Sequence, residues 1–295
     1  MDQIVVFLDG ARGESVLEAL LQARHGVAAV VSRTDKLSEK SRHLVQTHGV
    51  PYLVRPDVNA AAAIAELAGY RAKLFLVAGF ATLFTEELFA LPEHGTINLH
   101  GGKLPKYRGG SPLNWQIING ETEAGISVLQ LDAGIDTGPV LAEGAIPIGP
   151  HDTIADLHRN ANAMFPTLVL QCLEELEAGR LVPKVQDETG AEYWHQRNDD
   201  DGRLNFQILS AVEADRYIRA LTRPYPGAWS LYRGTRVRLF AADFSPFRLK
   251  GAPGRIVYLQ GDGPFVICRD GALRITRYEI ESDRTERLRH GERLA

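Results

Sequence analysis

Three polar residues, Asn98, His100 and Asp136, have types and spacings that could serve the transfer of an acyl group to an amine. Asn98 and His100 lie two residues apart on an expected strand, so their side chains share one face. Asp136 follows a later strand, in a loop whose glycines at 134 and 138 allow backbone to approach a bound molecule. An amide, an imidazole and a carboxylate are therefore expected to converge on one pocket.

Each of these groups has a role when an amine attacks a formyl carbon. The attack places a negative charge on oxygen, to which the Asn98 amide would donate a hydrogen bond. Asp136 would orient His100 and stabilise its protonated form, and His100 would then carry a proton or donate to the oxyanion. A structural alternative stays open, because Asn-x-His or Asp-Thr-Gly alone is also common in capped turns.

The first part of the chain alternates strand and helix patterns. Ile4–Leu8 is a continuous apolar run, typical of a strand buried on both faces, and Ser15 with Glu18 predicts a capping box for the next helix. Further strands are expected at 27–31, 51–54, 74–78, 95–100 and 125–131, with helices at 36–48, 60–67, 112–119 and from Thr153 onward. This rhythm predicts a Rossmann-like α/β domain over residues 1–182, with ligands bound outside the carboxyl ends of parallel strands.

The remaining sequence predicts a linker and a second domain. Residues 183–204 are polar and irregular and include an acidic run at 199–201, interpreted as a solvated turn. Residues 205–295 carry short strand patterns at 236–241, 254–259, 265–268 and 273–278, separated by glycine-bearing turns. They predict a small C-terminal β-rich domain of OB-like type.

The bulk properties favour an intracellular globular protein. The net charge is -4, so a global basic surface for nucleic acid is absent. Cys172 and Cys268 lie far apart, which favours neither a disulfide framework nor a zinc site, and Cys172 falls on the apolar stripe of a helix as inert core. The first residues are interpreted as a strand and not as a signal peptide, and no apolar run is long enough to span a bilayer. We therefore expect a cytoplasmic protein without a membrane partner.

The segment 97–112 carries Asn-x-His, then Leu-Pro at 104 and 105 and Arg-Gly at 108 and 109, and residues 132–138 have the pattern Asp-x-Gly-x-Asp-Thr-Gly. Together these motifs resemble the signature of the folate-dependent formyltransferases. By this resemblance Asn98, His100 and Asp136 are the catalytic residues. Segments 193–206 and 223–228 are similar to the linker and C-terminal domain of members that act on tRNA or on sugars.

The resemblance also implies 10-formyltetrahydrofolate as the formyl donor, with no metal. Its pterin would lie between two loops, the second of which could offer backbone groups to the polar edge of the ring. Ordinary packing at the start of a helix is the alternative for Leu83 and Phe84. The expected donor-binding residues are Thr82, Leu83, Phe84, Asp132, Ala133, Gly134 and Ile135.

The acceptor amine is predicted to belong to a nucleotide-linked amino sugar, with methionyl-tRNA as the alternative. The loop at 101–105 departs from the tRNA enzymes, and segment 109–115 resembles the sugar enzymes, although Gly110 stands where one of these has arginine. Lys103, Lys106 and Arg108 could meet a nucleotide diphosphate, or form a solvated basic loop that Arg108 pins. The acidic run at 199–201 argues against tRNA. A catalytically inactive relative that binds folate or a nucleotide is a third reading, and the second domain could contact substrate or form a homodimer.

Overall fold

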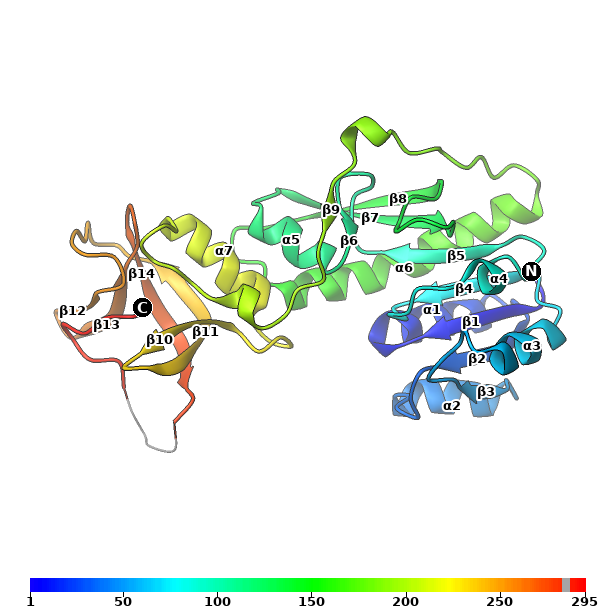
Figure 1. Ribbon diagram of the computed structural model, residues 1–295, viewed down its shortest axis with the longest axis horizontal. Coiled ribbons are helices and arrows are strands. Elements are labelled where there is room, and N and C mark those ends of the chain that lie inside the picture. The colour runs from blue at the N-terminus through cyan, green and yellow to red at the C-terminus, as the bar shows by residue number, and fades with distance from the viewer. Residues whose placement is uncertain (283–286) are drawn as a thin grey trace. The chain divides into compact units, whose positions relative to one another are not determined.

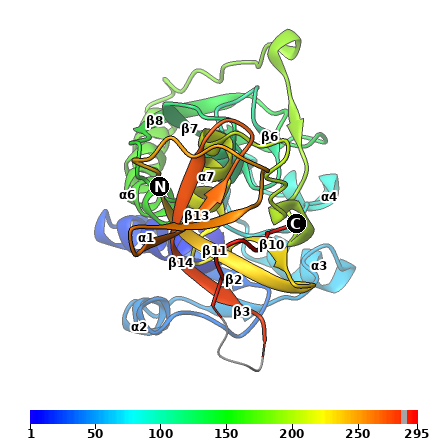
Figure 2. The same ribbon diagram turned by 90° about the vertical axis from the view of Figure 1, so that its left-hand side faces the viewer.

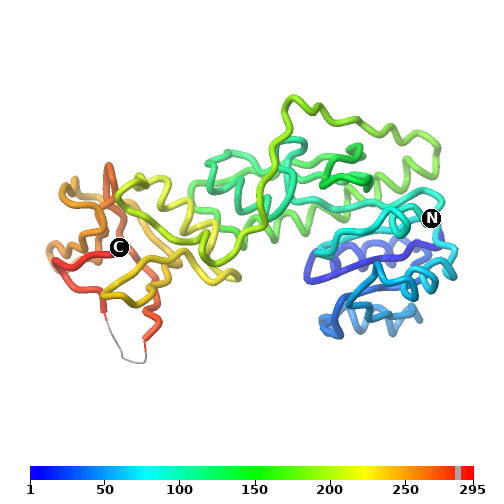
Figure 3. Tube along the Cα trace, viewed as in Figure 1, coloured from blue at the N-terminus to red at the C-terminus, as the bar shows by residue number. Residues whose placement is uncertain are grey.

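The computed structural model describes residues 1–282 and 287–295, drawn as a ribbon in Figure 1 and as a chain trace in Figure 3. The chain divides into two compact units. The first contains Met1–Pro112, Gly125–Ile146 and Arg159–Trp194, and the second contains Leu113–Ala124, Pro147–His158 and His195–Ala295. The division at residue 194 falls inside the segment predicted as a linker, and two earlier segments belong to the second unit.

The first unit is built on a seven-stranded sheet in the order β3-β2-β1-β4-β5-β7-β8. The strands from β3 to β5 are parallel, whereas β7 runs antiparallel to β5. Every residue of β1 and of β4 is buried, as their continuous apolar sequences predict. The predicted parallel α/β fold is confirmed. The strands are β1 Ile4–Leu8, β2 Val27–Ser32, β3 Tyr52–Val54, β4 Leu74–Ala78, β5 Thr96–His100, β7 Glu123–Gln130 and β8 Val140–Pro147.

Helices cover both faces of this sheet. Figure 2 shows α1 and α2 on one side of the strands and α3 on the other, as in a doubly wound fold. Among the described helices, the 24-residue α6 included, none is long and apolar enough to cross a membrane. The helices of the first unit are α1 Gly10–Gln22, α2 Glu39–Thr47, α3 Ala61–Gly69 and α4 Glu86–Phe89, with α6 Ile154–Glu177 from Arg159 onward; α5 Pro112–Ile118 belongs to the second unit from Leu113 onward.

The predicted capping box at Ser15 and Glu18 is wrong. Helix α1 begins at Gly10, directly after Asp9, so Ser15 lies inside the helix and its hydroxyl donates to the carbonyl of Arg12 at 2.9 Å. The predicted start of α6 is confirmed: the Asp156 carboxylate accepts from both the backbone N–H and the hydroxyl of Thr153. A serine hydroxyl can also bond to a nearby carbonyl inside a helix, so Ser-x-x-Glu alone does not mark a helix start.

The first half of the predicted linker packs along the first unit. Strand β9, Tyr193–Trp194, pairs in parallel with β6, Arg108–Gly109. The Trp194 ring stacks on the Tyr107 ring with centroids 5.7 Å apart, and its indole N–H donates to the carbonyl of Lys106. This segment, which contains the short 3₁₀ helix η1 Glu188–Gly190, therefore braces the loop that follows β5.

The second unit contains a five-stranded antiparallel sheet in the order β10-β11-β14-β13-β12. The predicted C-terminal β-rich domain is confirmed. Its helix α7, Ala211–Leu221, was not predicted, although Ser210 and Glu213 form a complete capping box there. The strands are β10 Ala228–Tyr232, β11 Thr235–Phe244, β12 Ile256–Leu259, β13 Asp262–Ile267 and β14 Ala272–Ile280, preceded by the 3₁₀ helix η2 Asp200–Gly202.

The acidic run at 199–201 is largely neutralised within the second unit. Asp199 forms ion pairs with Arg236 and Arg238, and Asp201 lies 3.3 Å from His195. Hydrogen bonds from Arg238, with the charge of Arg236, lower the pKa of Asp199. The run is therefore part of a charge network and not the isolated acidic turn that its sequence suggests.

This network predicts a pH-dependent contribution to stability. A carboxylate whose pKa is lower in the folded state stabilises the fold above its unfolded pKa of about 3.9, and this contribution is lost as pH falls through the folded pKa. The stability difference between wild type and Asp199→Asn should therefore shrink between about pH 5 and pH 2. Chemical denaturation at several pH values measures it, with Asp243→Asn, an exposed aspartate outside this network, as control. A difference that grows toward low pH would contradict the network's role.

The two cysteines are buried and unpaired. Burial raises the pKa of Cys172 to about 11 and, with the charge of Asp270, that of Cys268 to about 12. The predicted core position of Cys172 is confirmed.

Both thiols should resist modification in the native protein. The thiolate is the reactive species and is scarce at pH 8 at both positions. We expect slow reaction with a disulfide reagent in buffer and rapid reaction of both thiols in denaturant. Rapid native labelling of either cysteine would contradict the burial described here.

Candidate active site

His100 and Asp136 meet at the end of strand β5. The His100 Nδ1 lies 3.4 Å from the Asp136 Oδ2, and the two side chains are only 6% and 12% exposed. His100 is the last residue of β5, and Asn98 precedes it by two positions, on the same face and half-buried. The structure thus brings the predicted imidazole and carboxylate together. Their catalytic roles stay predictions.

Both nitrogens of the His100 ring face hydrogen-bond acceptors. Nε2 lies 2.6 Å from the carbonyl oxygen of Tyr107, and Nδ1 faces the Asp136 carboxylate. With an acceptor at each nitrogen, the orientation of the ring is fixed from both sides. Gly102 allows the arrangement, because a Cβ there would lie 2.5 Å from both the His100 Nε2 and the Tyr107 oxygen.

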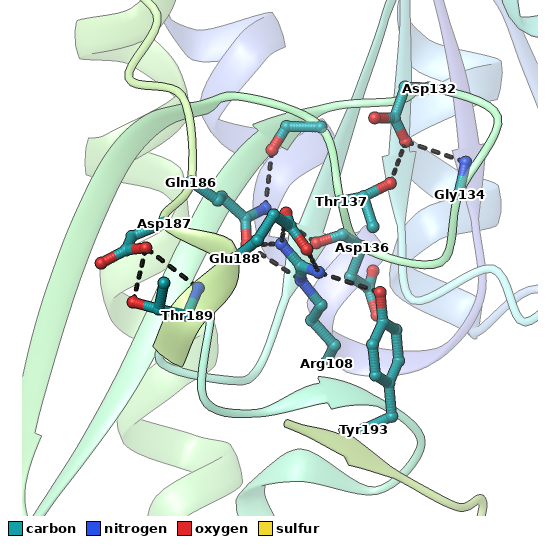
Figure 4. A network of polar contacts seen from close by, with 11 residues as sticks. Arg108, Asp132, Gly134, Asp136, Thr137, Gln186, Asp187, Glu188, Thr189 and Tyr193 are labelled. Atoms are coloured by element: carbon teal, nitrogen blue, oxygen red, sulfur yellow. Dashed lines mark hydrogen bonds and ion pairs between the residues drawn. The ribbon is translucent and has the colours of Figure 1, made fainter. Parts of the chain in front are cut away.

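Several hydrogen bonds hold the loop that carries Asp136, and Figure 4 shows some of them. Asp136 has a left-handed φ of 52°, and the backbone N–H of Gly109 donates to its Oδ2 at 2.9 Å. Asp132 closes the preceding turn by accepting from the Gly134 N–H at 3.0 Å and from the Thr137 hydroxyl at 2.5 Å. The Asp132 carboxylate therefore fixes the shape of the loop that contains Asp136.

The loop at 82–84 offers one exposed and one partly buried apolar side chain. Leu83 is 72% exposed, while Phe84 packs edge-on against Phe7 with centroids 4.8 Å apart. Phe84, and Leu131 just before the loop at 132–138, both pack against the same core cluster. Asn59, which the sequence interpretation missed, holds the 82–84 loop through bonds to the Leu83 carbonyl and the Thr85 N–H, each 2.9 Å.

These two loops present apolar side chains beside polar backbone groups. Leu83 and Ile135 expose apolar side chains at the loop surfaces, 72% and 47% respectively, and the loops also carry backbone groups. Such a mixture is typical of sites for aromatic ligands. Contact of the predicted donor-binding residues with a folate stays a prediction. Among the described residues, no group of His, Cys, Asp or Glu could hold a metal ion.

The predicted cationic residues lie in two different environments. Lys103 and Lys106 are exposed, as a contact with a substrate phosphate requires. Arg108 is fully buried and donates to Gln186, Glu188 and the hydroxyl of Tyr193. Its geometry matches the alternative that it pins the loop and disfavours the predicted contact with a diphosphate. Gln186 and Glu188 lie in the predicted linker and were missed as residues near the site.

The sequence of this chain matches models of a known protein family. Residues 2–172 match the family model described as formyl transferase, and residues 197–290 match the model described as its C-terminal domain. The methionyl-tRNA formyltransferase of Pseudomonas paraeruginosa is 34% identical over 272 residues, which are 90% of this chain and 86% of the relative. That of Geobacter metallireducens is 32% identical over 273 residues, 90% of this chain and 86% of the relative.

Solved structures share the fold at lower identity. An N-formyltransferase from Helicobacter canadensis, in complex with folinic acid and dTDP-3-aminofucose, has a TM-score of 0.72 at 17% identity and covers 95% of this chain and 100% of its own. HypX from Aquifex aeolicus, in complex with tetrahydrofolic acid, has a TM-score of 0.69 at 24% identity and covers 95% of this chain and 44% of its own.

The comparisons overturn our expectation about the acceptor. The prediction of a nucleotide-linked amino sugar, with nucleic acid disfavoured, is wrong: relatives similar over nine tenths of the chain are named methionyl-tRNA formyltransferase. The sugar enzyme resembles this chain only in fold. One physical reason for the error is the pairing of Asp199 with Arg236 and Arg238, which weakens the repulsion of phosphates inferred from the acidic run.

Proposed function

We propose, on the premise that this chain belongs to the formyl transferase family, that it transfers the formyl group of 10-formyltetrahydrofolate to the amino group of methionyl-tRNA. Family membership makes the chain a folate-dependent formyltransferase. The observation that carries the acceptor is the 34% identity to methionyl-tRNA formyltransferase over 90% of the chain. A cytoplasmic location, 10-formyltetrahydrofolate as the specific donor and a possible homodimer belong to the proposal as predictions.

The chemistry requires no covalent intermediate with the protein. The acceptor amine attacks the formyl carbon, forming one C–N bond, and the bond from that carbon to N10 of the folate then breaks. The Asn98 amide and His100 stabilise the negative oxygen of the tetrahedral intermediate. The amine loses a proton and N10 gains one, and His100 is the group that carries a proton between them. The pairing of His100 with Asp136 at 3.4 Å supports this assignment.

Asp136 acts on the reaction through His100. Its carboxylate faces Nδ1, so it fixes the ring and stabilises the positive charge that appears when the ring accepts a proton. The Tyr107 carbonyl fixes the other nitrogen. Both partners leave the ring with little freedom to rotate, and a fixed orientation is what proton transfer over a hydrogen-bond distance requires.

A direct assay tests both the proposed acceptor and the proposed transfer activity. Purified protein is incubated with 10-formyltetrahydrofolate and either methionyl-tRNA, the uncharged tRNA or a dTDP-linked amino sugar, and formylated product is measured. We expect formyl-methionyl-tRNA alone. Formylation of the sugar without formylation of the tRNA would refute the proposed acceptor, and no transfer to any amine would refute the proposed activity.

A further inference from the structure

Gln186 connects the Asp136 loop to a buried cation. Gln186 is only 8% exposed. Its Nε2 donates to two backbone carbonyls, that of Asp136 at 2.8 Å and that of Gly138 at 2.7 Å. Its Oε1 accepts from Arg108 Nε at 3.1 Å and Nη2 at 3.0 Å. One amide therefore spans the turn on either side of Thr137.

Arg108 fixes which way this amide points. A guanidinium group only donates hydrogen bonds, so Gln186 must present its oxygen to Arg108 and its NH₂ group to the loop. Arg108 is itself fully buried and bonded to both carboxylate oxygens of Glu188, at 2.9 and 2.6 Å, and to the Tyr193 hydroxyl. Figure 4 shows Arg108 surrounded by the side chains of Gln186, Glu188 and Tyr193.

The direction of β7 explains why the loop needs such an anchor. Strand β7 runs antiparallel to β5, with Gln130 opposite Ile97 and Ser127 opposite His100. The loop therefore leaves β7 near the start of β5, and the chain must turn back for Asp136 to reach His100 at the other end. Asp136 does so with a left-handed φ of 52°, a conformation that is uncommon for residues other than glycine.

We propose that Gln186 is a positioning residue for the reaction, which holds the Asp136 carboxylate against His100 by bonding the carbonyls of residues 136 and 138. The proposal rests on the role assigned to Asp136 under the proposed function. In this role Gln186 acts on the reaction through Asp136, and Arg108 acts through Gln186. Gly109, on the strand paired with β9, completes the anchor by donating to the same carboxylate.

The variant Gln186→Glu tests this role with little change of shape. Glutamate still accepts from Arg108, so that contact and the fold are retained, but it cannot donate to the two loop carbonyls. We expect kcat for methionyl-tRNA to fall by about 10- to 10²-fold with KM for both substrates within about threefold of wild type. Gln207→Glu, an exposed position in the second unit, is the matched control. A kcat within about twofold of wild type would overturn the proposal.

A double-variant cycle with Asp136→Asn shows whether Gln186 acts through Asp136. Gln186→Glu should lower kcat much less in the Asp136→Asn background than in wild type, because the carboxylate it positions is already gone. Equal losses in both backgrounds would show an independent, merely structural effect. Gln186→Met, which removes donor and acceptor at similar length, serves as a second variant and should show the same coupling.

A spectroscopic measurement tests the role of Gln186 without any acceptor substrate. The ¹⁵N chemical shift of the His100 ring should change in Asp136→Asn and change in the same direction in Gln186→Glu. If Asp136→Asn leaves the signal and the turnover unchanged, the proposed site fails. If Asp136→Asn changes both and Gln186→Glu changes neither, only the positioning role of Gln186 fails.

Discussion

Replacing His100 by alanine is expected to lower kcat for formyl transfer by about 10²- to 10⁴-fold, the range usual for loss of a positioned proton-transfer group. The ring lies between the Asp136 carboxylate and the Tyr107 carbonyl, and no other side chain is assigned to carry the proton. The loss should fall on kcat more than on KM for the donor. Steady-state kinetics with both substrates varied measures it.

The fold should survive the change at His100. His100→Asn retains a hydrogen-bonding side chain and therefore controls for the cavity that alanine would leave. Thermal unfolding of both variants measures their stability. His151→Ala removes an exposed histidine and is the matched control. Near-normal turnover in folded His100→Ala would remove the imidazole from the mechanism.

Asp136→Asn is expected to lower kcat by about 10²-fold or more while leaving the protein folded. Asparagine has nearly the same shape and its oxygen can still accept from the Gly109 N–H, but it carries no charge to stabilise a protonated His100. The effect therefore isolates the charge from the shape of the loop. Rapid-quench measurement of a single turnover reports on the chemical step.

The control for this variant is Asp243→Asn, an exposed aspartate on β11 in the second unit. Its kcat should match that of wild type. If Asp136→Asn also transferred formyl groups at the wild-type rate, the contact between Nδ1 and the carboxylate would have no function in catalysis.

Much of the first unit's fold could be predicted because its signals are local. The all-apolar runs at 4–8 and 74–78 coincide with β1 and β4, since strands buried on both faces need no polar positions. Two serine-based caps show the limit of such signals: Ser15 with Glu18 lies within a helix, whereas the complete box at Ser210 and Glu213 was overlooked. A capping pattern identifies a helix start only when the chain before it is not already helical.

The site could be predicted only in part, because some of its residues bond to partners far away in the sequence. Asn98, His100 and Asp136 stand out by type and by resemblance, and the structure places His100 and Asp136 in contact. Gln186 and the environment of Arg108 did not stand out, because their bonds join residues 48 to 85 positions apart. A polar segment without a repeating pattern reads as a linker until its partners are known.

Local charge is an equally weak guide when its partners are distant. Asp199 looks like part of an exposed acidic run, yet Arg236 and Arg238 on β11 pair with it. The formal charge of three consecutive aspartates therefore overstates the field that an approaching phosphate meets.

The most direct test of the account is a crystal structure of the protein with a stable folate analogue whose formyl group is on N10, the position from which the group is transferred. We predict that the formyl group lies beside Asn98 and His100, with its oxygen about 3 Å from the Asn98 amide nitrogen and the pterin between the loops at 82–84 and 132–136. A folate bound with its formyl group away from Asn98, His100 and Asp136 would contradict the assignment of this site.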